Sequence, residues 1–225
     1  MPGRSAAAAP GRVLALFDLD GTISVHDTLN RYLLEFIAHH PGCALRLPRA
    51  LPALVRFLSG HSDQGALKSA WIRAVLGGRS RAELASWTAQ FVPPLIARGL
   101  HADALSAIAA HRAAGDALVL LSASPDLYVP ALGEALGFTA TVCTAIAWQA
   151  DRLDGALASP NRRGTEKARC LIELRRRYGL PVTAYANAAS DLEHLALAEY
   201  PRLVNGTRAT RAAAARLGIP CLRWR

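Results

Sequence analysis

Two carboxylates two residues apart, Asp18 and Asp20, directly follow the apolar segment 13–17. Side chains alternate along a strand, so at the end of a buried strand these two carboxylates point to the same side. Anions this close repel each other unless a cation lies between them or one carboxyl group is protonated. Gly21 permits a backbone geometry that a side chain would hinder, and Thr22 can hydrogen-bond within the turn. Because ligands bind at the carboxyl ends of strands in open α/β sheets, we expect a charged site here.

Three later segments also place polar side chains at the ends of predicted strands or helices. The apolar segment 117–121 is followed by Ser122, and Lys167 stands near a predicted helix start. Asn187 and Asp191 follow a further predicted strand with a spacing of four residues. Taken singly, Ser122 is typical of a strand cap and Lys167 of a surface helix. Together with the acidic pair, they form a set of four segments in a fixed order along the chain.

In this order the segments resemble the four motifs of the haloacid dehalogenase-like phosphatase superfamily, whose first motif Asp-x-Asp-Gly-Thr matches residues 18–22. The resemblance covers roughly residues 13–224 and is closest to the phosphoserine-phosphatase-like branch, subfamily IB. It implies an α/β fold with a Rossmann-like parallel sheet as its core and an inserted helical cap. We expect the discontinuous core at residues 13–26 and 106–225, and the cap at residues 27–105.

The residue types suit hydrolysis of a phosphomonoester. Asp18 is expected to act as the nucleophile that forms an aspartyl phosphate, which water then hydrolyses. Asp20 is expected to protonate the leaving oxygen and afterwards to deprotonate that water. Ser122 and Lys167 would supply a hydroxyl group and a positive charge to the phosphoryl oxygens. The sequence thus predicts a phosphatase whose partner is a small-molecule phosphomonoester.

Mg²⁺ is the expected cofactor, because it prefers octahedral oxygen ligation and neutralises a phosphate dianion. The resemblance implies Asp18, the backbone carbonyl of Asp20, and Asp191 as metal-binding groups. The family's fourth motif usually begins Gly-Asp, whereas this chain has Ala186 and Asn187. The amide oxygen of Asn187 can still bind Mg²⁺ but adds no formal charge, so metal affinity should fall. Two interpretations stay open: a working phosphatase, and a phosphate-binding regulatory protein whose turnover is impaired at Asn187.

The expected substrate site also includes Gly21, Ala123, Asp27 and Lys68. Asp27 matches the cap-entry acid that contacts the substrate amine in phosphoserine phosphatases, but it is equally typical of a helix N-cap. Lys68 is the nearest candidate for the cap cation that holds the serine carboxylate in those enzymes. The favoured substrate is therefore a small, phosphoserine-like phosphorylated metabolite.

Segment 42–58 is apolar with Arg46, Arg49 and Arg56 interspersed. It is too short and too interrupted to span a bilayer, but it could lie on an anionic membrane surface. A related bacterial family of lipid phosphatases has a similar apolar stretch at this place. A lipid phosphate, such as a phosphatidylglycerophosphate-like molecule, is therefore an alternative substrate.

The chain has 225 residues and a net charge of +9, and 24 of its 26 basic residues are arginine. No nucleic-acid-binding motif accompanies this charge and aromatic residues make up 6%, so we expect a solvated arginine-rich surface without a nucleic-acid partner. Where arginine has nearly displaced lysine, Lys167 indicates a need for a compact ammonium group. Four cysteines without metal-binding spacing favour a reducing cytoplasm. The short apolar stretch within residues 1–12 argues against an export signal.

Strands alternate with helices after residue 105, which predicts a parallel sheet. Residues 27–105 show helical spacing and no strand alternation, which predicts about four helices. The oligomeric state is left open. Expected strands are 13–17, 117–121, 140–147, 182–186 and 202–204, and expected later helices are 126–136, 165–178, 191–198 and 208–216.

Overall fold

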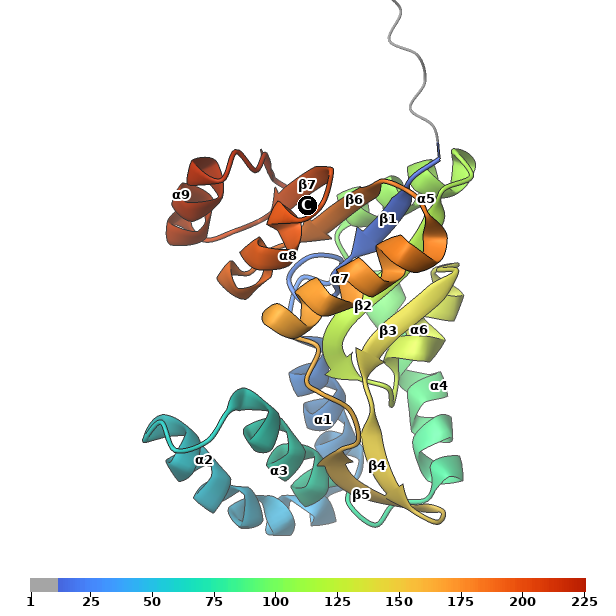
Figure 1. Cartoon of the computed structure of the whole chain (residues 1–225). Helices are drawn as coiled ribbons and strands as arrows, with labels where there is room; N and C mark the ends of the chain where they lie inside the picture. Colours follow the sequence, from blue (N-terminus) through green and yellow to red (C-terminus); the bar gives the residue numbers. More distant parts are fainter. Residues whose placement is uncertain (1–11) are drawn as a thin grey trace, which may run out of the picture.

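A six-stranded parallel sheet forms the centre of the protein, seen in a computed structural model that describes residues 12–225 (Figure 1). The expectation about an export signal at residues 1–12 lies almost wholly outside the described residues. The strand order is β3-β2-β1-β6-β7-β8, and every neighbouring pair runs parallel. The predicted α/β fold with a parallel sheet is therefore confirmed.

The predicted alternation of strands and helices is present along the second half of the chain. The sheet strands are β1 (Leu14–Phe17), β2 (Ala117–Pro125), β3 (Ala140–Thr144), β6 (Val182–Ala186), β7 (Tyr200–Val204) and β8 (Cys221–Leu222). The helices around them are α5 (Ala102–Ala113), α6 (Val129–Ala135), α7 (Thr165–Tyr178), η2 (Ala189–Asp191), α8 (Leu192–Ala196) and α9 (Arg208–Arg216).

The central strand β1 is buried on both faces, which explains its uninterrupted apolar sequence. Leu14 and Leu16 belong to the hydrophobic cluster on one face of the sheet, and Ala15 and Phe17 to the cluster on the other. The strand order reverses at β1, between the branch that leads to β2 and the branch that leads to β6. At such a reversal the loops diverge and leave a crevice at the carboxyl ends of the strands.

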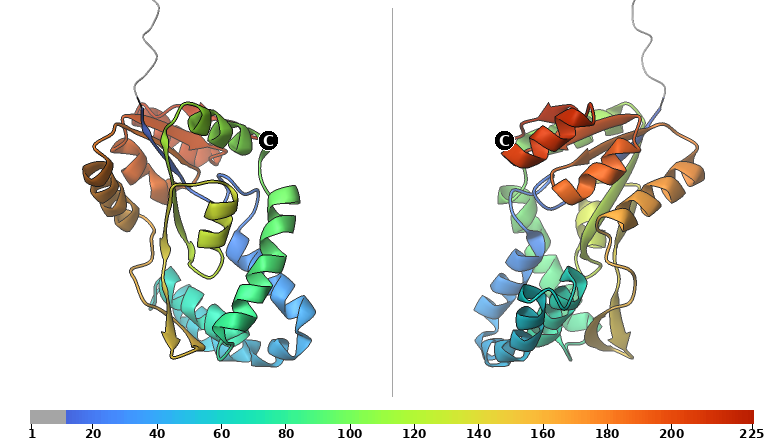
Figure 2. Two further views of the ribbon diagram at one scale, coloured as in Figure 1. Left: turned by 90° about the vertical axis from the view of Figure 1, so that its right-hand side faces the viewer. Right: turned by 60° about the vertical axis from the view of Figure 1, so that its left-hand side comes forward.

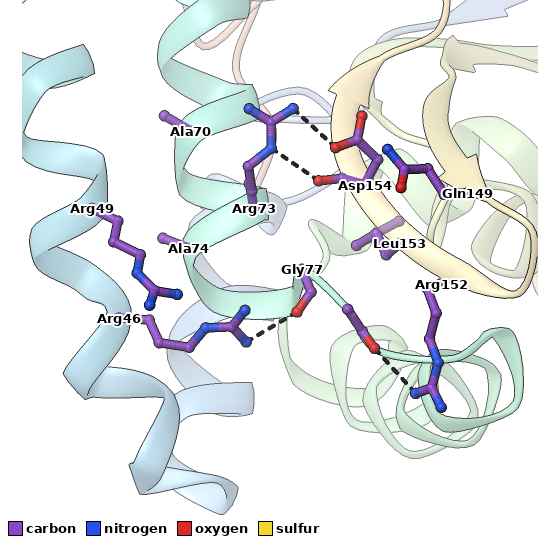
Figure 3. Close-up of a pocket in the computed structure, with 11 residues that line it drawn as sticks. Arg46, Arg49, Ala70, Arg73, Ala74, Gly77, Gln149, Arg152, Leu153 and Asp154 are labelled. Carbon is purple, nitrogen blue, oxygen red and sulfur yellow. Dashed lines mark hydrogen bonds and ion pairs between the residues drawn. The ribbon is translucent and has the colours of Figure 1, made fainter.

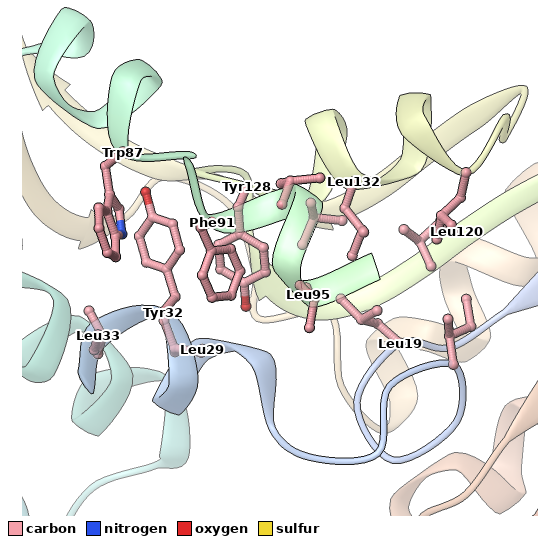
Figure 4. Close-up of a cluster of buried hydrophobic side chains, with 14 of the residues drawn as sticks. Leu19, Leu29, Tyr32, Leu33, Trp87, Phe91, Leu95, Leu120, Tyr128 and Leu132 are labelled. Carbon is pink, nitrogen blue, oxygen red and sulfur yellow. The ribbon is translucent and has the colours of Figure 1, made fainter. Parts of the chain in front are cut away.

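A group of helices lies beyond that edge of the sheet (Figure 1). They are α1 (Thr28–His39), the 3-10 helix η1 (Pro41–Ala50), α2 (Leu51–Leu58), α3 (Gln64–Leu76) and α4 (Arg81–Arg98). Tyr32 of α1 stacks on Tyr128 with ring centroids 4.8 Å apart, and Phe91 of α4 meets Tyr32 edge-on at 4.9 Å. Figure 4 shows that Leu132 and Leu120 belong to the same cluster of buried side chains as these rings. Helices α1 and α4 therefore share one hydrophobic core with the sheet, which fixes their position over its edge.

The prediction of one strand over residues 140–147 is wrong. Strand β3 ends at Thr144, and the chain continues as β4 (Ile146–Gln149) and β5 (Arg152–Leu157), an antiparallel hairpin. This hairpin leaves the sheet and lies beside the helices at the far end of the molecule (Figures 1 and 2). Ala150 in its turn has a φ of 52°, a conformation that usually calls for glycine or asparagine. The turn thus lacks the residues by which a hairpin is recognised in a sequence.

Candidate active site

Asp18 lies at the carboxyl end of β1, at the point where the strand order reverses. Its amide N–H donates to the carbonyl of Tyr185 at 2.9 Å, so the β1–β6 pairing continues to the start of the acidic loop. Lys167, in the first turn of α7, donates to Asp18 Oδ1 at 2.6 Å and to Asp191 Oδ1 at 2.9 Å. Two carboxylates that are 149 and 24 residues from Lys167 in the sequence thus share one ammonium group.

This group of three is almost sealed from water: 7% of Asp18, 3% of Lys167 and 2% of Asp191 are exposed. Burial raises the pKa of Asp18 to about 6 against the attraction of Lys167. The pKa of Asp191 lies below its ordinary value, because Lys167 and His194 outweigh the effect of burial. The pKa of Lys167 is raised because both carboxylates together outweigh burial. One ammonium cannot compensate two carboxylates, so a buried excess of negative charge remains at Asp18.

Asp20 points to the same side of the loop but has its own set of partners. Its Oδ1 accepts from the amide and the hydroxyl of Thr28, both at 2.6 Å, and its Oδ2 accepts from Ser124 Oγ at 2.6 Å. The hydroxyl of Tyr128 lies 2.8 Å from Thr28 Oγ1 and extends this series of hydrogen bonds into the core. Burial, with the charge of Asp27, raises the pKa of Asp20 although these hydrogen bonds oppose the shift. A proton is therefore easier to keep on Asp20 than on an exposed carboxylate.

Asn187 follows β6 and packs against Gly21. Gly21 has a φ of 75°, and a Cβ atom there would stand 2.0 Å from Asn187 Nδ2. A glycine is thus required on two grounds, the left-handed backbone and the close approach of the amide. This contact holds the side chain of Asn187 against the turn that carries Asp18 and Asp20.

These groups line a cavity of about 110 Å³ that we call the β1 cavity. Its charged lining consists of four carboxylates and three cations, contributed by the loop between β1 and α1, helix α3, the segment before α7, α7 itself and the segment after β6. They are Asp18, Asp20, Asp27, Asp191, Lys68, Arg163 and Lys167. The residues predicted as charged site residues, far apart in the sequence, thus come together in one place.

Within residues 12–225, no group of three or more His, Cys, Asp and Glu side chains is arranged to hold a metal ion. The available donors are instead the carboxylates of Asp18 and Asp191, the amide of Asn187 and backbone carbonyls. Mg²⁺ is commonly held by one or two carboxylates together with substrate phosphate and water. The donor set therefore fits Mg²⁺, and the negative charge that Lys167 leaves uncompensated favours a cation at this place.

Two residues of the expected cap reach the β1 cavity. Asp27 Oδ1 accepts from the amide of Asn30 at 2.7 Å and so caps α1, while the residue also lines the cavity. The two alternatives for Asp27 are therefore compatible. Lys68 of α3 donates to Ala123 O at 2.5 Å and to Asn161 Oδ1 at 2.7 Å. Burial lowers the pKa of Lys68 to about 8, although Asp20 and Asp27 favour its charged form.

Ser122 lies deeper than expected. Its side chain is fully buried, its Oγ accepts from the amide of Ser124 at 3.0 Å, and it is not part of the cavity wall. Ser124 and Ala123 line the cavity instead. The sequence contained a signal for Ser124, because residues two apart on a strand share a side. Thr28 carried no such signal, since its contact with Asp20 depends on how α1 enters the core.

An open parallel sheet with helices on both faces and a site at its strand reversal defines a doubly wound, Rossmann-like α/β protein. The family model of haloacid dehalogenase-like hydrolases matches residues 15–196, a span that includes all four segments of the site. The chain belongs to the haloacid dehalogenase-like hydrolase family.

Relatives and solved structures agree with this assignment. Protein CicA of Caulobacter vibrioides is 31% identical over 191 residues, which cover 83% of each chain. A probable phosphatase of Mycobacterium tuberculosis is 28% identical over 228 residues, covering 98% of this chain and 78% of that protein. A Bordetella pertussis protein described as of unknown function has a similar fold, with a TM-score of 0.81, 23% identity, and coverage of 95% of this chain and 99% of that one. A phosphoserine phosphatase in a phospho-aspartyl intermediate analogue form aligns with a TM-score of 0.65 and 14% identity, over 95% of this chain and 94% of that one.

Proposed function

We propose that this protein is a Mg²⁺-dependent phosphomonoester hydrolase that acts through an aspartyl phosphate on Asp18. The observation that carries the proposal is the difference between two neighbouring carboxylates. Lys167 gives Asp18 a cation at hydrogen-bond distance, whereas Asp20 is held by neutral hydroxyl and amide donors alone, and burial raises the pKa of both. Two carboxylates in contrasting environments at one site are the arrangement that allows one to attack and the other to transfer protons.

In the first step, a carboxylate oxygen of Asp18 forms a bond to phosphorus as the bond from phosphorus to the leaving oxygen breaks. Asp20 gives its proton to that oxygen, so the leaving group departs as an alcohol. In the second step, Asp20 takes a proton from water, whose oxygen attacks phosphorus and frees Asp18. Lys167 keeps Asp18 ionised and oriented, and its charge faces the developing negative charge on the phosphoryl oxygens. Mg²⁺, when bound by Asp18, Asn187 and Asp191, would neutralise the phosphate dianion.

The direct test is hydrolysis of p-nitrophenyl phosphate by the purified protein, with Mg²⁺ and with excess EDTA. We expect turnover with Mg²⁺ that stops in EDTA and returns when Mg²⁺ is added again. Saturable phosphate binding without turnover at any Mg²⁺ concentration would instead favour the other interpretation, a phosphate-binding regulatory protein whose turnover is impaired at Asn187.

For the substrate we propose a small phosphorylated metabolite with an amine and a carboxylate, similar to phosphoserine. Asp27 and Lys68 support this, since they bring one carboxylate and one ammonium to the β1 cavity from the cap helices. Asp27→Ser retains a good N-cap but removes the charge, whereas Asp27→Ala removes both. We expect both variants to lose selectivity for phosphoserine over p-nitrophenyl phosphate. A loss confined to Asp27→Ala, with a lower melting temperature, would assign Asp27 to the helix cap alone.

A lipid phosphate is the second candidate substrate. The observation that favours it is the exposed apolar surface of η1 and α2. Leu45, Leu51, Val55 and Leu58 are 86%, 52%, 63% and 74% exposed, and α2 has no buried residue. Residues 41–62 contain three arginines and no acidic residue. An apolar face with basic neighbours suits an anionic bilayer surface. No helix within residues 12–225 has the length and apolar character needed to cross a bilayer.

Sedimentation with lipid vesicles separates the two candidates. Binding to phosphatidylglycerol vesicles that is lost in Leu45→Ser/Val55→Ser, together with faster hydrolysis of a lysophospholipid phosphate than of phosphoserine, would favour the lipid substrate.

We further propose a reducing, cytoplasmic location, supported by four cysteines that form no disulfide bond with one another.

A further inference from the structure

A second cavity, separate from the β1 cavity, lies at the far end of the helical region and has a volume of about 410 Å³ (Figure 3). Three segments build it: η1, helix α3 and the hairpin β4–β5. Their charged residues on the wall are four arginines and one carboxylate, namely Arg46, Arg49, Arg73, Arg152 and Asp154. We call it the arginine cavity.

Backbone contacts between the hairpin and α3 hold the walls of the arginine cavity in place. Leu153 of the hairpin forms two backbone hydrogen bonds with the segment that follows α3. Its carbonyl accepts from the amide of Gly78 at 2.8 Å, and its amide donates to the carbonyl of Arg79 at 2.9 Å. Gly155 has a φ of 91°, and a Cβ atom there would stand 2.9 Å from the Cα of Arg73. The hairpin therefore packs directly on the backbone of α3. Small residues on the α3 side, Ala70 among them, leave the space between the segments open.

Backbone carbonyls orient two of the four guanidinium groups. Arg46 donates to the carbonyl of Gly77 at 3.0 Å, and Arg152 donates to the carbonyl of Gly78 at 3.2 Å. A carbonyl fixes the direction of a guanidinium without cancelling its charge, and each of these contacts uses one of five N–H donors. The remaining donors stay available to a ligand.

Only part of the positive charge is compensated. Asp154 pairs with Arg73 at 3.1 Å, and Glu83, outside the cavity wall, approaches Arg152 at 3.7 Å. Arg49 is exposed, and its side chain forms no hydrogen bond or ion pair with any residue of the described part of the chain. Figure 3 shows its guanidinium directed from η1 toward α3. Like charges gathered at one concave place are costly without an anion, so the cavity is suited to an anionic ligand.

From these features we propose that the arginine cavity binds a compact soluble polyanion that carries at least two phosphoryl groups. Guanidinium groups bind phosphoryl oxygens through paired N–H donors, and two or more such groups on one ligand would match arginines from different segments. The cavity volume falls within the range of about 300–1,000 Å³ typical of small-molecule sites. A single phosphate would leave most of these donors unused.

Calorimetric titration of the full-length protein with tripolyphosphate tests the proposal, and Arg49→Gln/Arg152→Gln is the decisive variant. Removing charged hydrogen-bond donors should weaken binding by about tenfold per guanidinium. Arg56→Gln/Arg98→Gln, which removes two exposed arginines outside the cavity, is the matched control and should leave the affinity unchanged. Hydrolysis of p-nitrophenyl phosphate and circular dichroism should be the same in all three proteins, which shows that the β1 cavity and the fold are intact.

Three outcomes would overturn the proposal. Equal tripolyphosphate affinity in the parent and the double variant would place binding in the β1 cavity or on the general surface. An equal loss in Arg56→Gln/Arg98→Gln would mean that net charge alone attracts the anion. Arginine-dependent binding to phosphatidylglycerol vesicles without binding of tripolyphosphate would assign the same guanidinium groups to a lipid headgroup.

Discussion

The β1 cavity and the arginine cavity use charge in opposite ways. In the β1 cavity, Lys167 is 3% exposed and lies between two buried carboxylates, so signs are matched at hydrogen-bond distance. In the arginine cavity, the side chains of Arg73 and Arg152 are 55% and 66% exposed, and backbone carbonyls orient Arg46 and Arg152. Water screens the exposed charges, whereas burial makes each charge in the β1 cavity depend on its partners. Removing one charge should therefore change activity and stability strongly at the first site and only slightly at the second.

The largest contrast is expected for the carboxylates. Asp18→Asn should lower p-nitrophenyl phosphate hydrolysis by roughly 10³-fold or more, because the amide keeps the shape but cannot act as the nucleophile. Asp154→Asn, the matching change in the arginine cavity, should leave kcat/KM within about twofold of the parent. Steady-state kinetics at saturating Mg²⁺ measure both. An Asp18→Asn activity within about tenfold of the parent would rule out the covalent route.

The cations should show the same contrast in stability. Lys167→Met leaves two buried carboxylates without a cation and should lower the free energy of unfolding by about 3 kcal/mol in EDTA. Arg73→Gln removes a largely exposed ion pair and should cost less than about 1 kcal/mol. Urea denaturation measures both changes. Mg²⁺ should restore part of the loss in Lys167→Met, and a deficit that ignores Mg²⁺ would argue against a metal beside Asp18.

The Mg²⁺ concentration needed for half-maximal activity tests whether Asn187 is a metal ligand in the β1 cavity. Asn187→Asp adds a full negative charge with nearly the same shape, so half-maximal activity should need roughly tenfold less Mg²⁺. The variant is measured beside the parent in a Mg²⁺ titration at constant ionic strength. Gln149→Glu, which adds the same charge on the wall of the arginine cavity, should leave that requirement unchanged. An unchanged or higher Mg²⁺ requirement in Asn187→Asp would exclude Asn187 as a metal ligand.

Helix α3 connects the two cavities, since it carries Lys68 into one and Arg73 into the other. Burial lowers the pKa of Lys68 to about 8, so this side chain loses its proton as the pH rises through that value. Attraction for a substrate carboxylate disappears with the proton. We expect kcat/KM for phosphoserine to fall severalfold between about pH 7 and about pH 9, relative to that for p-nitrophenyl phosphate. Arg73→Gln should keep this pH difference, and Lys68→Gln should abolish it.

Most of the sheet could be predicted from the sequence, and the hairpin could not. Strands β1 and β6 are short, mostly apolar runs that end directly before Asp18 and Asn187, so composition marks their carboxyl ends. Strand β4 follows β3 after a single residue, and no glycine or proline separates the two. The turn at Ala150 has a left-handed backbone without a glycine, and the packing of the hairpin on α3 is a contact that the local sequence does not show.

The residue types and spacing determined by themselves which groups could do chemistry. Strand periodicity indicated Asp18 and Asp20, and the resemblance of the later motifs to those of a known family indicated Lys167 and Asp191. Only the tertiary structure decided how they share charge, since one ammonium between two carboxylates requires three distant segments to meet. It also decided that Ser124 rather than Ser122 lines the cavity, and that four of twenty-four arginines gather at one concave site. Burial and long-range packing set those outcomes, and neither is encoded in the spacing of neighbouring residues.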